Sequence, residues 1–127
     1  MCKFTKYKQP KRLKNLFCKD CFTYLKELAG NIDFESWINS ISFVRNICAH
    51  YGRLYNVKLV KQPMLYKEYK EVSNYRIFAV ILCMKHIIKN EMVWLTFKND
   101  LLSLIDKYST SINLEYISFV DGWENLV

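Results

Sequence analysis

Between Arg45 and His50 the chain combines side chains that can bind an anion and transfer a proton. An arginine guanidinium stays charged and offers a planar fork of donors to an oxyanion. A histidine imidazole has an unperturbed pKa of about 6.5, so it can accept or donate a proton near neutral pH. On an α-helix Arg45 and His50 lie about 140° apart around the axis, whereas Asn46 shares a face with His50. The spacing therefore predicts an anion clamp, an amide and a proton shuttle around one cleft.

The residues that follow add candidate contacts to a polyanion. Arg53 lies just past the expected helix end, and Lys58 and Lys61 come soon after it. Tyr51 and Tyr55 belong to a set of tyrosines that can stack on nucleic-acid bases. Tyrosine is equally common where a core meets water, and the acids near the later lysines fit an ordinary solvated surface equally well.

Structural roles stay open for the same residues. A histidine near a helix C-terminus often caps the helix, where the dipole favours its protonated form. Arg45 could pair with an acid such as Glu35 or Asp100, and Asn46 could be a surface residue. Arg53 could bind the last carbonyls of the helix.

The helix that positions these residues is expected from Phe34 to about Tyr51. Asp33 is a suitable N-cap, and Gly52 can supply the left-handed residue that ends the helix. Apolar residues recur along it at steps of four, three and four, which predicts one buried face. They are Trp37, Ile41, Val44 and Cys48.

The rest of the chain predicts a single all-α domain over residues 1–127, with about four main helices. A helix from Ser73 or Asn74 to about Lys89 carries a fully buried set, Phe78, Ile81, Leu82 and Ile88. The other expected segments are an irregular basic lead-in at 1–12, a helix at about 11–29 closed by Gly30, a connector at 53–72 with short helical turns or a functional loop, a helix from about Glu91 to Tyr108, and an irregular segment at 109–127.

Composition and charge indicate a folded protein with a basic end. Hydrophobic residues make up 51% of the 127 residues, and the net charge is +7. Residues 1–30 hold eight Lys or Arg and two acids, whereas 111–127 hold three acids and no Lys or Arg. A basic end favours nucleic acid or an acidic membrane surface, although a solvated tail explains it equally well.

Cysteine usage predicts a reducing compartment. The five cysteines are an odd number without repeated spacing, in a chain apolar enough to fold without disulfides. Cys18 and Cys21 have Cys-x-x-Cys spacing, but a second pair for a zinc site is missing, so we expect half-buried thiols. No signal peptide is visible, and the longest apolar run, Phe78–Met84, is too short to span a bilayer. We expect a cytoplasmic protein with no membrane partner, metal or cofactor.

The stretch Arg45-Asn46-Ile47-Cys48-Ala49-His50-Tyr51-Gly52-Arg53-Leu54-Tyr55-Asn56 closely resembles the signature of bacterial abortive-infection (Abi) proteins of the AbiD and AbiF type, in the HEPN superfamily. An arginine, a polar residue and then a histidine is the hallmark of HEPN ribonucleases. Glu35-Ser36-Trp37 and Gly122-Trp123-Glu124 also resemble the family pattern. Such proteins are usually much longer, so the chain resembles their C-terminal half. It also has Phe119-Val120-Asp121 where they tend to have a Gly-Phe-Pro turn.

The resemblance implies a HEPN-like helical bundle, a homodimer that joins two motifs in one cleft, and metal-independent RNA cleavage that leaves 2′,3′-cyclic phosphate ends. It implies a role in phage defence or a toxin–antitoxin pair, with an antitoxin or a regulatory RNA as a further partner. The catalytic residues would be Arg45, Asn46 and His50. The RNA or phosphate contacts would be Arg53, Tyr51, Tyr55, Asn56, Lys58 and Lys61.

Two other functions stay open. One is a non-catalytic RNA- or protein-binding module of HEPN type, which includes a shortened remnant of a longer Abi protein. The other is a helical DNA-binding domain driven by the basic N-terminus, although the expected second helix lacks the polar face of a recognition helix.

Overall fold

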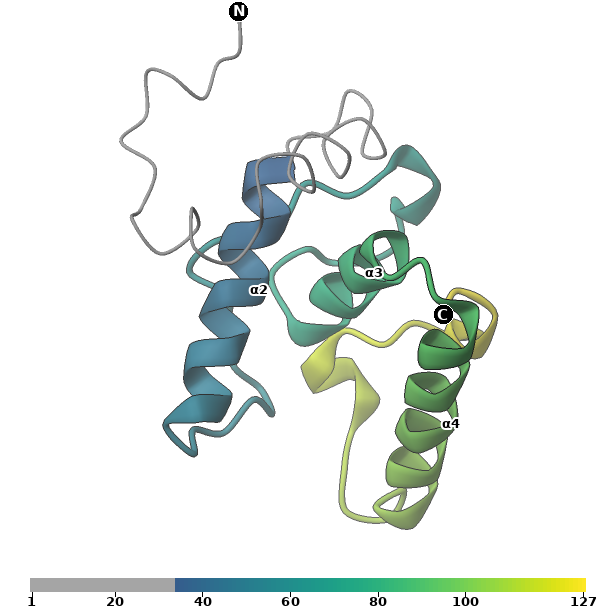
Figure 1. Ribbon diagram of the computed structural model, residues 1–127. Helices are drawn as coiled ribbons and strands as arrows, with labels where there is room; N and C mark the ends of the chain where they lie inside the picture. The colour runs from purple at the N-terminus through teal and green to yellow at the C-terminus, as the bar shows by residue number, and fades with distance from the viewer. Residues whose placement is uncertain (1–33) are drawn as a thin grey trace, which may run out of the picture. The chain divides into compact units, whose positions relative to one another are not determined.

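The computed structural model describes residues 34–127, which Figure 1 draws in colour. The chain divides into two compact units, residues 1–30 and 31–127, and the fold below belongs to the second. The expected lead-in, the helix at 11–29, the Asp33 cap and the Cys18–Cys21 pair lie outside the described residues. The single-domain assignment stays a prediction.

Helices and short helical turns make up all the regular structure in the described part of the chain. The α-helices are α2 (Phe34–Ala49), α3 (Ile77–Ile87) and α4 (Glu91–Lys107), and the 3-10 turns are η3 (Lys67–Tyr69), η4 (Leu114–Ile117) and η5 (Trp123–Asn125). No strand occurs among these residues, so the all-α prediction is confirmed. The helices expected at 34–51 and 91–108 end within two residues of the predicted bounds, and η3 is a helical turn of the kind expected in the connector.

The third helix begins later than the sequence predicts, at Ile77 instead of next to Ser73 or Asn74. The residues before it are bound to an earlier part of the chain. The Asn74 side chain donates to the Pro63 carbonyl at 3.4 Å, and the Leu59 amide donates to the Tyr75 carbonyl at 2.8 Å. These long-range bonds hold Asn74 and Tyr75 outside the helix, so the predicted cap is wrong.

The core is built around α3, whose residues from Phe78 to Cys83 are all buried. Ile88 is only partly buried because it is the C-cap, so its expected full burial is wrong. The C-terminal segment contributes Phe119 and Trp123, whose rings contact Phe78. Partly buried residues of α4 pack against the same cluster: Trp94, Phe97, Leu101, Leu102 and Ile105. In Figure 1, α2 and α4 lie on opposite sides of α3.

The first half of α2 is bound to the chain at 61–64. The Trp37 indole donates to the Met64 carbonyl at 2.6 Å, and the Met64 amide donates to the Ser36 hydroxyl at 2.9 Å. The buried Ser40 hydroxyl lies 2.9 Å from the Lys61 carbonyl. All four buried residues of α2 lie between Phe34 and Ser40. Burial therefore anchors one end of α2 and leaves the other end near solvent.

Candidate functional site

The Arg–Asn–His motif occupies the solvent-exposed C-terminal end of α2. Arg45, Asn46 and His50 are all exposed. An Arg45 guanidinium nitrogen donates to the Asn46 side-chain oxygen at 3.3 Å. Arg45 forms no ion pair with Glu35 or Asp100, both of which are described. Cys48, expected on the apolar face, is also exposed.

A Schellman-type cap ends the helix directly after the motif. The Tyr51 amide donates to the Cys48 carbonyl at 3.1 Å, and the Gly52 amide donates to the Ile47 carbonyl at 2.8 Å. The left-handed residue is Tyr51, with φ of 55°, so its assignment to Gly52 is wrong. The motif therefore ends in an aromatic residue held in a conformation that usually belongs to glycine or asparagine.

Gly52 is needed for space. A Cβ atom there would lie 2.7 Å from Ile47 Cγ2 and 3.1 Å from the Ile47 carbonyl oxygen. The glycine lets the chain turn back tightly against the last turn of α2, which in turn sets the direction in which Tyr51 leaves the helix.

The structure places Tyr55 and Asn56 in contacts that hold the following loop. The Tyr55 hydroxyl accepts a hydrogen bond from the Asn113 amide at 2.9 Å, and its ring packs edge-on against Tyr116. The Asn56 side chain accepts a hydrogen bond from Arg76 at 2.6 Å. Their polar groups thus already bind neighbours that are distant in sequence. Their contact with RNA stays a prediction.

Arg53, Lys58 and Lys61 are exposed on the chain that returns from α2. None of their charged groups has a hydrogen bond or ion pair with a described residue. Arg76 lies beside this loop through its bond to Asn56, although nothing in its local sequence spacing links it to the motif. The bond to Asn56 brings a further guanidinium close to the predicted site.

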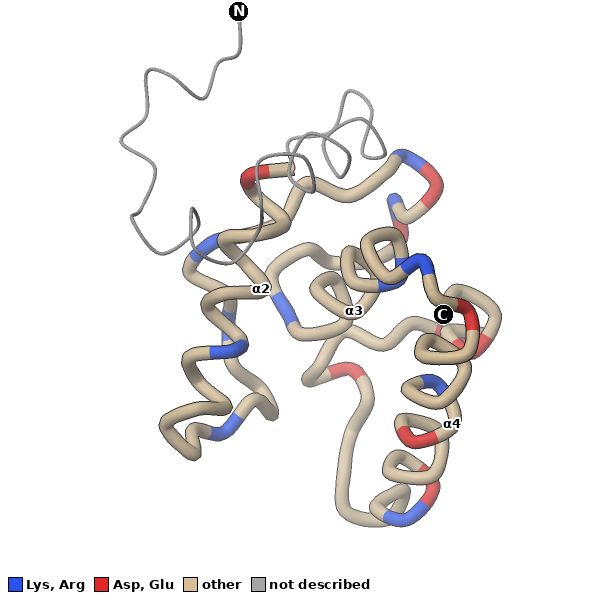
Figure 2. Tube along the Cα trace, viewed as in Figure 1, with Lys and Arg blue, Asp and Glu red and all other residues tan. Residues whose placement is uncertain are grey.

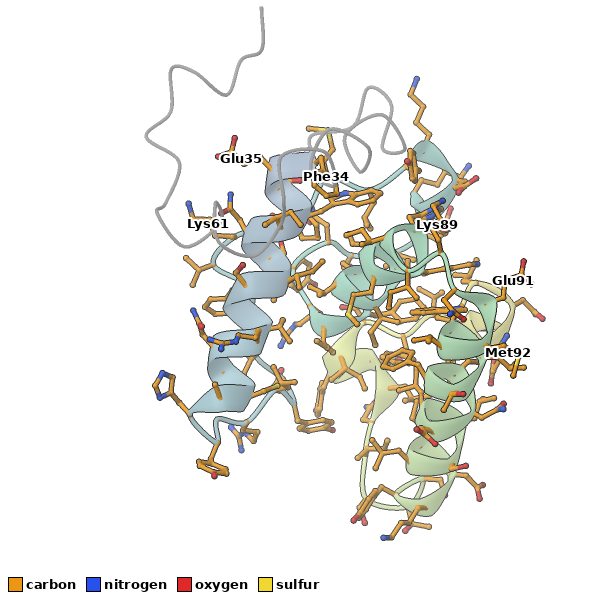
Figure 3. All side chains as sticks on the ribbon, in the orientation of Figure 1. Phe34, Glu35, Lys61, Lys89, Glu91 and Met92 are labelled. Carbon is orange, nitrogen blue, oxygen red and sulfur yellow. The ribbon has the colours of Figure 1, made fainter. Side chains whose placement is uncertain are left out.

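The charge around the motif has one sign. Residues 36–67 contain no Asp or Glu but hold five Lys or Arg, whereas residues 68–127 hold eight acids and six Lys or Arg. Figure 2 shows one blue position on α2 and further blue positions on the chain that follows it. Glu35, the single acid of α2, lies at the start of the helix, at the end away from the motif (Figure 3). This stretch of the sequence therefore carries no acid of its own that would repel a polyanion.

A separate, acidic pocket lies elsewhere in the unit. Its volume is about 410 Å³, and its lining includes Glu68, Glu71 and Asp121. No residue of the stretch from Arg45 to Asn56 lines it. Its charge is the opposite of the charge around the motif, so the pocket does not extend the predicted site.

The second histidine lies in an aromatic cluster between α2 and α3. His86 Nε2 is 2.7 Å from the Tyr69 hydroxyl, and the His86 ring packs against Tyr66 and Trp37. Burial lowers the pKa of His86. Burial also raises the pKa of Tyr69 to about 12. The arrangement supports a packing role for His86, away from the exposed motif.

No group of three or more His, Cys, Asp and Glu side chains among the described residues is placed to hold a metal ion. No helix between residues 34 and 127 is both long enough and apolar enough to cross a bilayer.

Comparison with known protein families gives a match. Residues 1–56 match the family model described as "Abi-like protein". Over residues 1–56 the chain is similar to the Abi-like family. This Abi-like segment contains all of α2 and ends at Asn56, the last residue of the resemblance noted in the sequence. It supports a function related to abortive infection. No curated protein and no solved structure matches the chain significantly.

Proposed function

We propose that the protein is a metal-independent endoribonuclease of HEPN type, acting in phage defence or in a toxin–antitoxin pair. Arg45, Asn46 and His50 are its catalytic residues. The observation that carries the proposal is their exposure together on the last turn of α2, within a stretch that has no acidic residue. The Abi-like family match over the same helix supports the biological setting.

The motif suits cleavage by the RNA's own 2′-hydroxyl. His50 accepts the 2′-hydroxyl proton while the 2′-oxygen bonds to phosphorus, and the bond from phosphorus to the 5′-oxygen breaks. An imidazolium returns a proton to the departing 5′-oxygen. Arg45 binds the phosphate oxygens and offsets their charge, and Asn46 orients the guanidinium that it already contacts. The products are a 2′,3′-cyclic phosphate and a 5′-hydroxyl.

The two proton transfers favour a homodimer. One motif supplies one imidazole, and a base and an acid acting together need two. Exposure of the motif at a helix end leaves it open to a second copy. Two motifs facing each other would form the cleft predicted from the sequence, with Arg53, Lys58 and Lys61 tracking the RNA backbone on either side.

The test is RNA cleavage by the purified full chain in the presence of EDTA. His50→Ala should lower the cleavage rate by about 10²- to 10⁴-fold, since that is the usual contribution of a general acid or base. Arg45→Ala should also lose activity, while RNA affinity of the His50 variant stays close to that of the wild type. Cys48→Ala, an exposed neighbour on the same helix turn, is the matched control and should cleave normally.

Two results would contradict the mechanism. Cleavage abolished by EDTA and restored by zinc or magnesium would replace it with a metal-dependent one. Full activity of His50→Ala would remove His50 from the reaction.

A non-catalytic RNA-binding module is the second candidate. The exposed basic chain after α2 supports it, because Arg53, Lys58 and Lys61 would bind phosphates whether or not the RNA is cut. RNA binding by a wild-type chain that cuts no RNA, with toxicity in the host unaffected by Arg45→Ala or His50→Ala, would favour this module.

A further inference from the structure

Tyr51 is the most exposed of the large hydrophobic side chains in the described part of the chain, with 99% of its surface accessible. It directly follows His50, and its φ of 55° is left-handed. Other exposed tyrosines of the unit keep more contact with the fold, such as Tyr108 at 44% exposure. Both faces of the Tyr51 ring are therefore open to a partner.

Folding alone does not explain a tyrosine at this position. The left-handed conformation costs a residue with a Cβ about 1–2 kcal/mol, and glycine or asparagine would end the helix more favourably. The ring offsets none of this cost by burial, because it is almost fully solvated. An aromatic side chain that is held at an unfavourable angle and left in water indicates a role in binding.

Hydrogen bonds and close packing fix the backbone at Tyr51. The amides of Tyr51 and Gly52 both bind carbonyls of the last helical turn. Gly52 lies so close to Ile47 that no Cβ fits between them. The ring thus projects from a fixed point, which lowers the entropy lost when a partner binds.

The surroundings identify the partner by its chemistry. Arg45 and Arg53 are exposed near Tyr51 in sequence, and no acid occurs between residues 36 and 67. A flat aromatic ring among cations fits a ligand that carries both a planar base and phosphates. Bases in a duplex are stacked on each other, so only an unpaired base can lie on a protein ring.

We propose that Tyr51 is a base-stacking residue that makes the motif select RNA with an unpaired nucleotide next to the bound phosphate. The proposal rests on the proposed ribonuclease function, because the phosphate is the one held by Arg45. Tyr51 follows His50 directly, so a base on its ring belongs to a nucleotide beside the cleavage point. Stacking would then contribute to both affinity and choice of site.

The experiment measures RNA binding in a His50→Ala background, so that cleavage does not consume the probe. The probes are a single-stranded oligoribonucleotide with one 2-aminopurine, the same strand with that base removed, and the duplex form. Tyr51→Leu should weaken single-strand affinity about tenfold and abolish the fluorescence quenching caused by stacking. Tyr51→Phe should retain both, because the ring is kept.

Two controls isolate the stacking. Tyr108→Leu removes an exposed tyrosine next to a cation at the end of another helix, and should leave affinity unchanged. Removing the base from the strand should weaken its binding to the chain with Tyr51 but not its binding to the Tyr51→Leu variant. Duplex affinity should be equal for all of these variants.

The proposal is overturned if the Tyr51→Leu variant binds the single strand as tightly as the chain with Tyr51 does. It is also overturned if the variant loses single-strand and duplex affinity equally. Cleavage by the chain with His50 is measured in parallel. Normal cleavage with no effect of Tyr51 ends the stacking proposal and leaves the proposed function intact. Absence of cleavage together with stacking on Tyr51 contradicts the ribonuclease and leaves the base contact standing.

Discussion

Tyr51 and Gly52 divide between them two tasks that one glycine often performs at a helix end. Tyr51 takes the left-handed conformation, and Gly52 allows the close approach to Ile47. This division frees the left-handed position for a side chain. It places an exposed ring directly beside His50, where a glycine would present nothing.

Gly52→Ala should reduce the free energy of unfolding by about 1–2 kcal/mol, because the new methyl group overlaps Ile47 Cγ2 and a β-branched side chain cannot easily turn away. Urea unfolding of the full chain measures the loss. In an Ile47→Ala background the same change should cost less, since Cγ2 is gone. Equal losses in both backgrounds would show that the contact with Ile47 is not the cause.

At the scale of the elements, α2 is held through side chains near its start. Trp37 binds the Met64 carbonyl and packs against His86 of α3. His86 in turn meets Tyr69 of η3. This cluster joins two helices and the connector. We therefore expect the protonation of His86 to affect how firmly α2 is anchored.

The cluster predicts a loss of stability in mild acid. Burial is the largest effect on His86, and it lowers the pKa of the imidazole below 6.5. Among the charged groups that face His86, Glu68 raises this pKa, whereas Lys85 and Lys89 lower it. Below about pH 6.5 the unfolded chain binds more protons at this residue than the folded chain does. The free energy of unfolding should therefore fall as the pH falls through this range.

Urea unfolding at about pH 7.5 and about pH 5.5 tests this, since the range brackets the unperturbed histidine pKa. His86→Gln should make the difference between the two pH values smaller. If His86→Gln keeps the whole difference, the pH dependence does not come from His86.

For the whole molecule, the uneven charge matters most. The stretch at 36–67 is basic without any acid, whereas residues 68–127 carry more acids than bases. Figure 2 shows red and blue positions mixed along α4, whereas the last part of α2 and the loop after it show blue positions alone. A polyanion is therefore expected to approach along α2 and the chain that follows it.

The salt dependence of RNA binding tests whether this basic stretch contacts the RNA phosphates. Changing Arg53 and Lys58 together to Gln should lower the slope of log affinity against log salt by about 1.4 for single-stranded RNA, or about 0.7 per phosphate contact. The matched control changes Lys89 and Lys107, two exposed cations outside the basic stretch, and should leave the slope unchanged. A similar drop in the control would assign binding to net charge alone.

Local pattern was enough to predict much of this unit. The bounds of α2 and α4 follow from apolar periodicity and from end signals within a few residues, and the burial of α3 follows from its continuous apolar sequence. The motif itself is also local, since only four residues separate Arg45 from His50 at the end of one helix.

Contacts between distant parts of the chain decided the rest. Bonds of Asn74 and Tyr75 to Pro63 and Leu59 delay the start of α3, and Asn113 engages Tyr55. No pattern within a short window can encode such pairs, because their energy exists only after the chain has folded back. The sequence by itself determined which residues are proposed to carry the chemistry and on which helix they lie. Only the tertiary structure decided that Tyr51 stands free in solvent beside His50 while Tyr55 and Asn56 hold the loop, because burial and hydrogen bonding are settled by neighbours far along the chain.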